Sequence, residues 1–318
     1  MKLRKLYSVV SLVLIAVLAC SLTGCKDSSQ TSNQYPLSSK ITVYATLYPV
    51  YDFTKKIGGD RVSVRCMVPP GADPHSWEPS PQDLAELQRA QVLVYNGAGM
   101  EPWIDKVLGA LDTKSMVVVE ATRGLPLLPA DTTHSDTHPH DQDWDPHVWL
   151  DPVLAQDMAK NIASGLSTAD PKNRGFYEKN CAQLVQKLEN LDRAYRAVIE
   201  KCQKHDIVVT HQAFGYMACR YGLNQQALMG VSAEAEPTPS AMARITEFCR
   251  RNDVHYIFFD KTTTPRLAQV IAEETGAKVL VLDPLGTLTE EQLKAGEDYF
   301  SIMYSNLENL RIALGYEP

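Results

Sequence analysis

The sequence has no basic segment and no regular cysteine pattern, and both absences exclude classes of protein. The formal net charge is −7, so no nucleic-acid-binding surface is indicated. The seven cysteines contain no C-x-x-C pair, which argues against a thiolate zinc site. After the N-terminal segment, no apolar run approaches the length of a membrane span. One disulfide is possible outside the cell, and the sequence does not assign its pair among Cys66, Cys181, Cys202, Cys219 and Cys249.

The N-terminal residues predict export and anchoring. A short basic start precedes an apolar run over residues 7–19 that is too short to be a dependable membrane span. The sequence Leu22-Thr23-Gly24-Cys25 then resembles the lipobox of bacterial lipoproteins, which implies removal of residues 1–24 and lipidation of Cys25. An ordinary cleaved signal peptide and an uncleaved anchor are the alternatives. Residues 25–39 are polar and predict a flexible tether, so we expect a protein anchored on the outer face of the cytoplasmic membrane.

Short β-branched runs alternate with helical stretches in each half of the chain. Apolar runs of this kind are typical of parallel strands that helices cover on both faces. We therefore predict an α/β fold of two lobes, residues 40–170 and 204–318, each built on a mainly parallel four-stranded sheet. The predicted strands are Ile41–Thr46, Val62–Val68, Val92–Tyr95 and Met116–Val119 in the first lobe, and Ile207–Thr210, Gln226–Leu228, Tyr256–Phe259 and Lys278–Leu282 in the second.

Helix starts are marked by a capping side chain directly before a proline, which loses no hydrogen bond at the first helical position. One long helix, about residues 171–203, is predicted to connect the lobes and to span roughly 50 Å. Its apolar stripe also fits a dimeric coiled coil. We favour a single helix that lies along both lobes of a monomer. The marked starts are Ser80-Pro81, Asp151-Pro152, Asp170-Pro171, Thr238-Pro239 and Thr264-Pro265.

Side chains of metal-ligand type follow predicted strands at four places. They are His75 and His147, each in an Asp-Pro-His sequence, and then His211 and Asp283. Ligands bind beyond the carboxyl ends of strands in open α/β sheets, so these four positions can converge on a cleft, two from each lobe. Three imidazoles and a carboxylate suit a divalent transition metal in tetrahedral geometry. Trp77 and Trp149 are interpreted as packing residues, and His205 and His255 as residues without a site role.

These segments resemble the metal-binding receptors of bacterial ABC importers for zinc and manganese, the ZnuA-like and TroA-like group. The resemblance covers nearly the whole mature chain. It implies a two-lobed fold with a helical spine, metal bound by His75, His147, His211 and Asp283, and an ABC permease and its ATPase as partners. Manganese receptors of the group usually carry a glutamate at the position of His211, so zinc is expected and manganese is the alternative. The matching segments are Asp73 to Pro81, Asp145 to Pro152, Thr210 to Tyr216, Glu234 to Pro237 and Asp283 to Gly286. No ligand role is assigned to Glu234 or Glu236.

A second histidine cluster, His134, His138 and His140, lies in a polar stretch over residues 129–143. It resembles a shortened form of the histidine-rich loop of zinc receptors, and a solvated loop without a metal role is the alternative. Two rival functions remain, an exported zinc hydrolase and an adhesin or structural lipoprotein. We expect no enzymatic activity, because Asp283 would fill the coordination position that a catalytic zinc keeps for water.

If Cys25 carries the lipid, then Cys25→Ala should move the protein out of the membrane fraction, because a cleaved chain without an acyl group has no anchor. Fractionation of cells that express the wild type or the variant measures this. A Cys20→Ala variant is the matched control and should stay membrane-bound. Equal membrane retention of Cys25→Ala and the wild type would contradict the lipoprotein interpretation.

Overall fold

Each half of the chain builds one sheet of four parallel strands, which confirms the predicted fold class. The computed structural model describes residues 40–130, 144–231, 237–261 and 266–318. The strand orders are β2-β1-β3-β4 in the first sheet and β6-β5-β7-β8 in the second. The strands are β1 (Ile41–Ala45), β2 (Val62–Cys66), β3 (Val92–Tyr95), β4 (Val117–Glu120), β5 (Asp206–His211), β6 (Asn224–Met229), β7 (Tyr256–Phe259) and β8 (Lys278–Val281).

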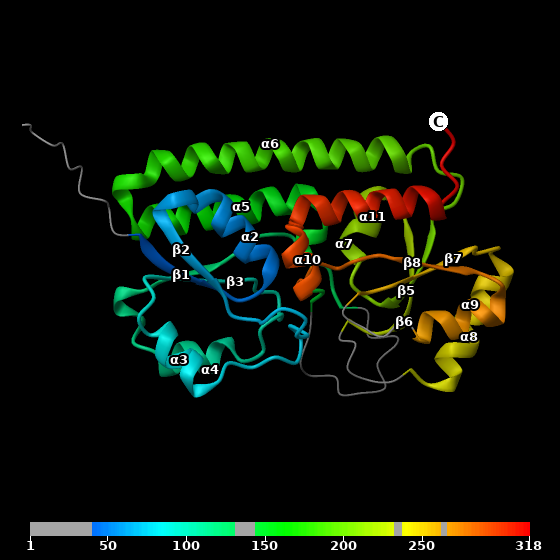
Figure 1. The fold of residues 1–318 in the computed structure, drawn as a ribbon, viewed down its shortest axis with the longest axis horizontal. Helices are drawn as coiled ribbons and strands as arrows, with labels where there is room; N and C mark the ends of the chain where they lie inside the picture. The colour runs from blue at the N-terminus through cyan, green and yellow to red at the C-terminus, as the bar shows by residue number, and fades with distance from the viewer. Residues whose placement is uncertain (1–39, 131–143, 232–236, 262–265) are drawn as a thin grey trace, which may run out of the picture. The chain divides into compact units, whose positions relative to one another are not determined.

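Helices alternate with these strands and cover the sheets (Figure 1). In each sheet the first strand along the chain lies between two later ones, so the order reverses beside β1 and beside β5. Loops at such a point diverge from the carboxyl ends of the strands and leave room for a ligand. The helices are α2 (Tyr48–Gly58), α3 (Pro81–Leu87), α4 (Ile104–Ala110), α5 (Pro152–Ala169), α6 (Arg174–Ile199), α7 (Gly215–Tyr221), α8 (Pro239–Arg251), α9 (Arg266–Thr275), α10 (Glu290–Ala295) and α11 (Tyr299–Ala313).

The predicted caps are confirmed at three of the five helix starts. Ser80, Asp151 and Thr238 each accept a hydrogen bond from a backbone amide in the first turn of α3, α5 and α8. Asp170 differs, because its side chain accepts no backbone amide at the following 3₁₀ turn (Pro171–Asn173). Its carboxylate instead accepts the hydroxyl of Tyr177, seven residues further on in the first turn of α6, at 2.8 Å. Thr264-Pro265 lies outside the described residues.

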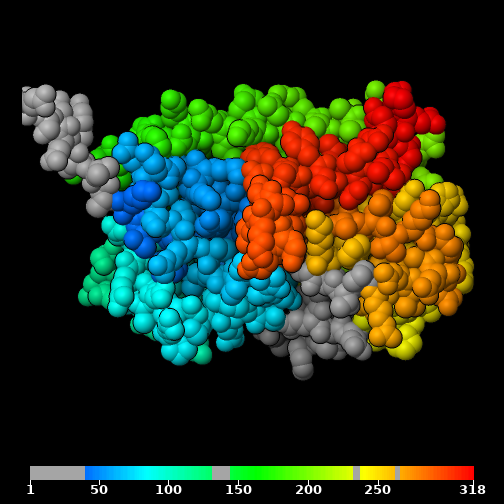
Figure 2. Space-filling model, viewed as in Figure 1, coloured from blue at the N-terminus to red at the C-terminus, as the bar shows by residue number. Residues whose placement is uncertain are grey.

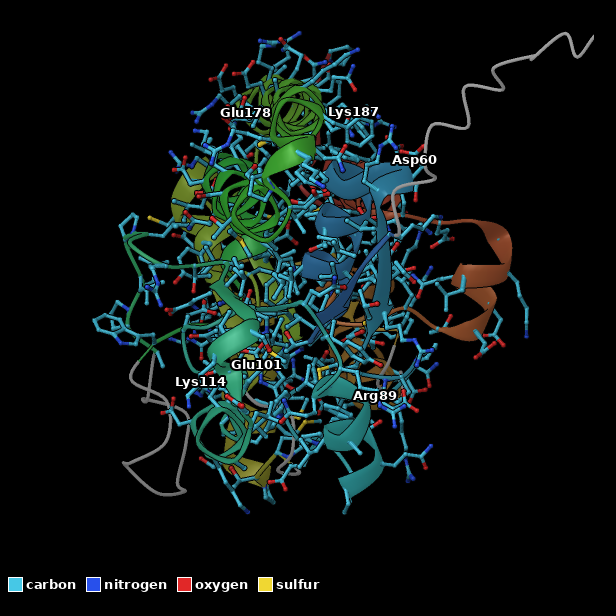
Figure 3. The ribbon with its side chains drawn as sticks, turned by 90° about the vertical axis from the view of Figure 1, so that its left-hand side faces the viewer. Asp60, Arg89, Glu101, Lys114, Glu178 and Lys187 are labelled. Carbon is cyan, nitrogen blue, oxygen red and sulfur yellow. The ribbon has the colours of Figure 1, made fainter. Side chains whose placement is uncertain are left out.

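The long helix is α6, and it is shorter than predicted. Its 26 residues span about 39 Å. The helix ends at Ile199, and Cys202 then forms an isolated β-bridge with Tyr316 near the C-terminus. The helix packs on α2, α5 and α11, and Glu178 and Lys187 lie on its outer face (Figure 3). Its apolar stripe is buried within the chain, so a coiled-coil partner is not needed to explain it. The buried stripe is Tyr177, Cys181, Leu184, Leu188, Leu191, Tyr195 and Ile199.

The two sheets share one principal core, which also includes α2, α5, α6 and α11. A smaller core lies in each lobe, around Ile257 in the second lobe and around Leu93 in the first. All five cysteines of the described residues are unpaired. None of the helices in the described ranges is long and apolar enough to cross a membrane.

The lobes also touch directly at the side where α10 and α11 follow the second sheet. Figure 2 shows residues of α10, in orange, against the N-terminal lobe, in blue. The backbone amide of Tyr48 donates to the carbonyl of Gly286 at 3.2 Å, and Lys56 pairs with Asp298 at 2.9 Å. These contacts hold the segment from Asp283 to α10 between the two lobes.

Candidate metal centre

Three imidazoles converge at the carboxyl ends of the strands. His75, His147 and His211 each offer a nitrogen, and the three nitrogens lie within 4.8 Å of one another. The Nε2 atoms of His75 and His147 are 3.2 Å apart. The sequence predicted this meeting of three separate segments, and the structure brings them together. Neutral imidazoles at this spacing can bind one divalent transition metal.

The two Asp-Pro-His sequences use the same local device. Asp73 accepts the backbone amide of His75 at 2.9 Å, and Asp145 accepts that of His147 at 3.0 Å. Such an Asx turn fixes the backbone two residues further on. Asp145 also contacts Nδ1 of His147 at 2.9 Å, and both residues are buried. This contact places the imidazole proton on Nδ1, so Nε2 of His147 presents its lone pair to the centre.

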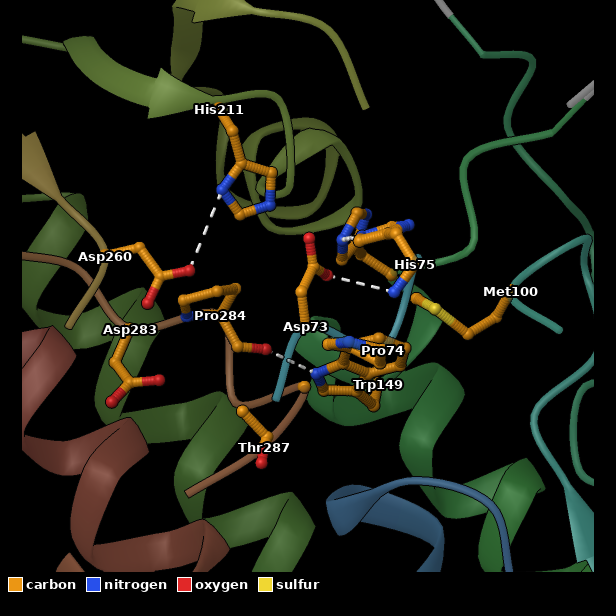
Figure 4. A pocket seen from close by; sticks show the side chains of 12 residues that line it. Asp73, Pro74, His75, Met100, Trp149, His211, Asp260, Asp283, Pro284 and Thr287 are labelled. Atoms are coloured by element: carbon orange, nitrogen blue, oxygen red, sulfur yellow. Dashed lines mark hydrogen bonds and ion pairs between the residues drawn. The ribbon is translucent and has the colours of Figure 1, made fainter. Parts of the chain in front are cut away.

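The third imidazole, His211, is the last residue of β5. Its Nδ1 lies 3.9 Å from the carboxylate of Asp260, and its other ring nitrogen points toward His75 (Figure 4). Asp260 directly follows β7 and is buried. The sequence reasoning did not single out Asp260. A signal was present, because Asp260 follows a strand of the same sheet as His211.

The fourth predicted ligand, Asp283, lines the same pocket but is turned away from the three imidazoles. Its carboxylate accepts the amide of Leu285 at 2.9 Å and the side-chain amide of Gln292 at 2.8 Å. Asn306 binds the backbone amide and carbonyl of Asp283. Two ligands of one zinc ion are at most about 4.2 Å apart, and among the described residues no carboxylate joins the three imidazoles within 4.8 Å. The ligand role of Asp283 therefore stays a prediction, and it requires the carboxylate to turn.

The remaining wall of the pocket is largely apolar. Trp149 was interpreted as a packing residue, and it is fully buried, but it also lines the pocket with its ring 5.3 Å from that of His147. Its indole N–H donates to the carbonyl of Pro284 at 2.7 Å. Trp77 only packs, at 5.7 Å from Trp103. The other wall residues are Asp73, Pro74, Met100, Pro284, Gly286 and Thr287. The second histidine cluster (His134, His138 and His140) and Glu234 and Glu236 lie outside the described residues.

Burial keeps two of the three imidazoles, those of His75 and His211, neutral. Desolvation, and then the neighbouring His147, lower the pKa of His211 from 6.5 to about 3. Desolvation also lowers the pKa of His75 well below its ordinary value, and both His147 and His211 add to the effect. A neutral imidazole has a free lone pair, so the site is ready for a cation without first losing protons. Burial raises the pKa of Asp283, although the amide of Leu285 and Gln292 oppose this.

The lowered pKa of His211 predicts acid sensitivity of the metal-free protein. Unfolded His211 takes up a proton near pH 6.5 and folded His211 only near pH 3, so stability is lost as the pH falls between these values. Within this window His211→Gln should make the free energy of unfolding less dependent on pH, by about 1 kcal/mol per pH unit. Urea denaturation at several pH values measures this. The exposed His205, changed to Gln, is the control, and equal slopes for all three proteins would contradict the prediction.

Comparison with known proteins agrees with this geometry. Residues 43–313 match the family described as ZnuA, zinc-uptake complex component A, periplasmic. Zinc-binding lipoprotein AdcA of Streptococcus pneumoniae is 38% identical over 95% of this chain, which spans 60% of the length of AdcA. The high-affinity zinc uptake system protein ZnuA of Bacillus subtilis is 35% identical over 95% of this chain and 97% of its own length.

Solved structures show the same arrangement of the chain. The Zn(II)-bound ZnuA-like domain of S. pneumoniae AdcA superposes with a TM-score of 0.76 at 38% identity, covering 86% of this chain and 99% of that domain. The laminin-binding protein Lmb of Streptococcus agalactiae, described as a bifunctional adhesin and metal transporter, gives a TM-score of 0.77 at 34% identity over 86% of this chain and 99% of its own. With its two parallel sheets, connecting helix and three converging imidazoles, the chain belongs to the ZnuA family.

Proposed function

We propose that the protein is the metal-binding receptor of an ABC importer, which captures Zn²⁺ between its two lobes and delivers it to a membrane permease. The observation that carries this proposal is the convergence of His75, His147 and His211, whose nitrogens lie within 4.8 Å of one another. The names of AdcA and of B. subtilis ZnuA, both zinc proteins, support the choice of metal. The permease and its ATPase are the partners that an uptake system of this kind needs.

The proposed ligands are His75, His147, His211 and Asp283. The first three already have their nitrogens close together, and Asp283 would complete a tetrahedron after its carboxylate turns inward. Three imidazoles and one carboxylate favour zinc over manganese, because manganese prefers oxygen ligands and binds most weakly in the Irving–Williams order. Manganese uptake is the alternative within the same function.

Metal binding with transport, rather than catalysis, fits this ligand set. Three imidazoles with a vacant fourth position also describe a catalytic zinc site, so an exported zinc hydrolase is the rival. In the proposed complex Asp283 takes the position of the activated water, and no metal-bound water remains to attack a substrate. The rival would gain support from zinc-dependent hydrolysis that is lost in His147→Ala.

Attachment to the membrane is part of the proposal. The lipobox at Cys25, the signal over residues 1–24 and the tether over residues 25–39 would place the receptor on the outer face of the cytoplasmic membrane as a monomer. The proposed lobes are residues 40–170 and 204–318, joined by a linking helix over residues 171–203. The description of Lmb as an adhesin favours adhesion as a second function. His134, His138 and His140 would act as an auxiliary zinc-collecting loop.

Single alanine substitutions test the ligand assignment. Replacement of His75, His147, His211 or Asp283 removes one donor and should weaken zinc binding by more than the roughly 10–100-fold that is typical of losing a residue that only holds a ligand in place. Competition against a chromophoric zinc chelator measures the affinity. The exposed His255, changed to Ala, is the matched control and should bind like the wild type. Unchanged affinity in any two of the four variants would refute the site.

Direct competition between zinc and manganese tests the choice of metal. The wild type should bind zinc more tightly, and His211→Glu should raise manganese binding relative to zinc, because it exchanges an imidazole for a hard oxygen donor. Equilibrium dialysis with both ions, followed by elemental analysis, gives the ratio. His205→Glu controls for added negative charge away from the site. A wild type that prefers manganese would overturn the zinc assignment while leaving the receptor function standing.

A further inference from the structure

The carboxylate of Asp283 is held by a side chain whose orientation is fixed. Gln292 is buried in α10 and donates its amide hydrogen to Asp283 at 2.8 Å. Its amide oxygen accepts the backbone amide of Thr289 at 2.9 Å, as the third residue of a capping box. Because Thr289 can only donate there, the amide cannot flip, and its NH₂ group must face Asp283.

This contact keeps Asp283 out of reach of the imidazoles. Ligands that share one zinc ion are at most about 4.2 Å apart, and Asp283 does not come within the 4.8 Å that groups the three imidazole nitrogens. The backbone of Asp283 is fixed by Asn306, so the side chain has to rotate to reach a metal. Rotation breaks the hydrogen bond from Gln292 as well as the one from the backbone amide of Leu285. Metal binding by Asp283 therefore costs a charge-assisted hydrogen bond.

We propose that Gln292 restrains Asp283 and thereby weakens zinc binding and speeds zinc release. The inference rests on the proposed function, in which Asp283 is the fourth ligand. Gln292 touches no metal in this proposal and acts only through Asp283. A restraint of this kind suits a receptor that has to give up its zinc to a permease, because a fourth ligand that is drawn away from the ion makes the bound state easier to leave.

The test is Gln292→Met, which keeps the length of the side chain but removes the donor. Zinc binding should become about tenfold tighter, which corresponds to the loss of a weak hydrogen bond to a charged group. Release of zinc to an excess of chelator should slow by a similar factor. A purely structural role for Gln292 predicts the opposite, since damage to a site weakens binding. Gln292→Leu lacks the same donor and is the second variant if Gln292→Met does not fold.

Two controls separate this inference from the proposed function. Thr289→Ala removes the hydroxyl that caps α10 but keeps the backbone amide that orients Gln292, so its zinc affinity should match the wild type. Asp283→Ala with Gln292→Met should bind zinc no more tightly than Asp283→Ala alone. Unchanged or weaker binding by Gln292→Met overturns the restraint when Asp283→Ala still loses affinity. If Asp283→Ala itself binds like the wild type, the fourth ligand is wrong and the restraint falls with it.

Discussion

Three imidazoles, packed together where the carboxyl ends of the two sheets meet, are the arrangement on which the rest of this protein depends. Burial of polar nitrogens costs free energy unless each has a partner. Asp145 supplies one for His147, and Asp260 lies near His211, but Nδ1 of His75 is buried and has no hydrogen bond to any of the described residues. Desolvation opposes protonation so strongly that the pKa of His211 falls to about 3. Under the proposed function, a cation at the centre would accept the lone pairs of the nitrogens that face it.

The site depends on a fold that brings three separate segments of the chain to one point. His75 and His147 belong to the first lobe, and His211 is the last residue of β5, an inner strand of the second sheet. The carboxyl ends of both sheets must therefore face the same pocket. One hydrophobic core shared by both lobes fixes their positions relative to each other. Trp149 strengthens this link, because its indole N–H binds Pro284 and its carbonyl accepts the hydroxyl of Tyr299. The wall of the site is thus also the contact between the lobes.

Features with a local signal could be predicted from the sequence, and features set by tertiary packing could not. Short segments of the sequence are enough to recognise the β-branched runs, the caps such as Ser80 and the three histidines. The structure places these features where the sequence predicts them. Asp170 has the sequence of a cap, but its carboxylate accepts the side chains of Asn173 and Tyr177 instead of a backbone amide. The orientation of Asp283 depends on the nearby amide of Leu285 and also on Gln292, and the contact with Gln292 has no signal in the local sequence.

The surroundings of Asp283 show how affinity and release can be adjusted without changing a ligand. Asn306 fixes the backbone of this residue, and Gln292 holds its carboxylate, so the free energy of turning inward is determined by groups that need never touch the metal. The same Gln292 caps α10, which packs against the junction of the lobes. Any movement of α10 relative to β8 therefore changes the hydrogen bond to Asp283. A partner that displaced α10 would alter the coordination of the proposed zinc ion through this one contact.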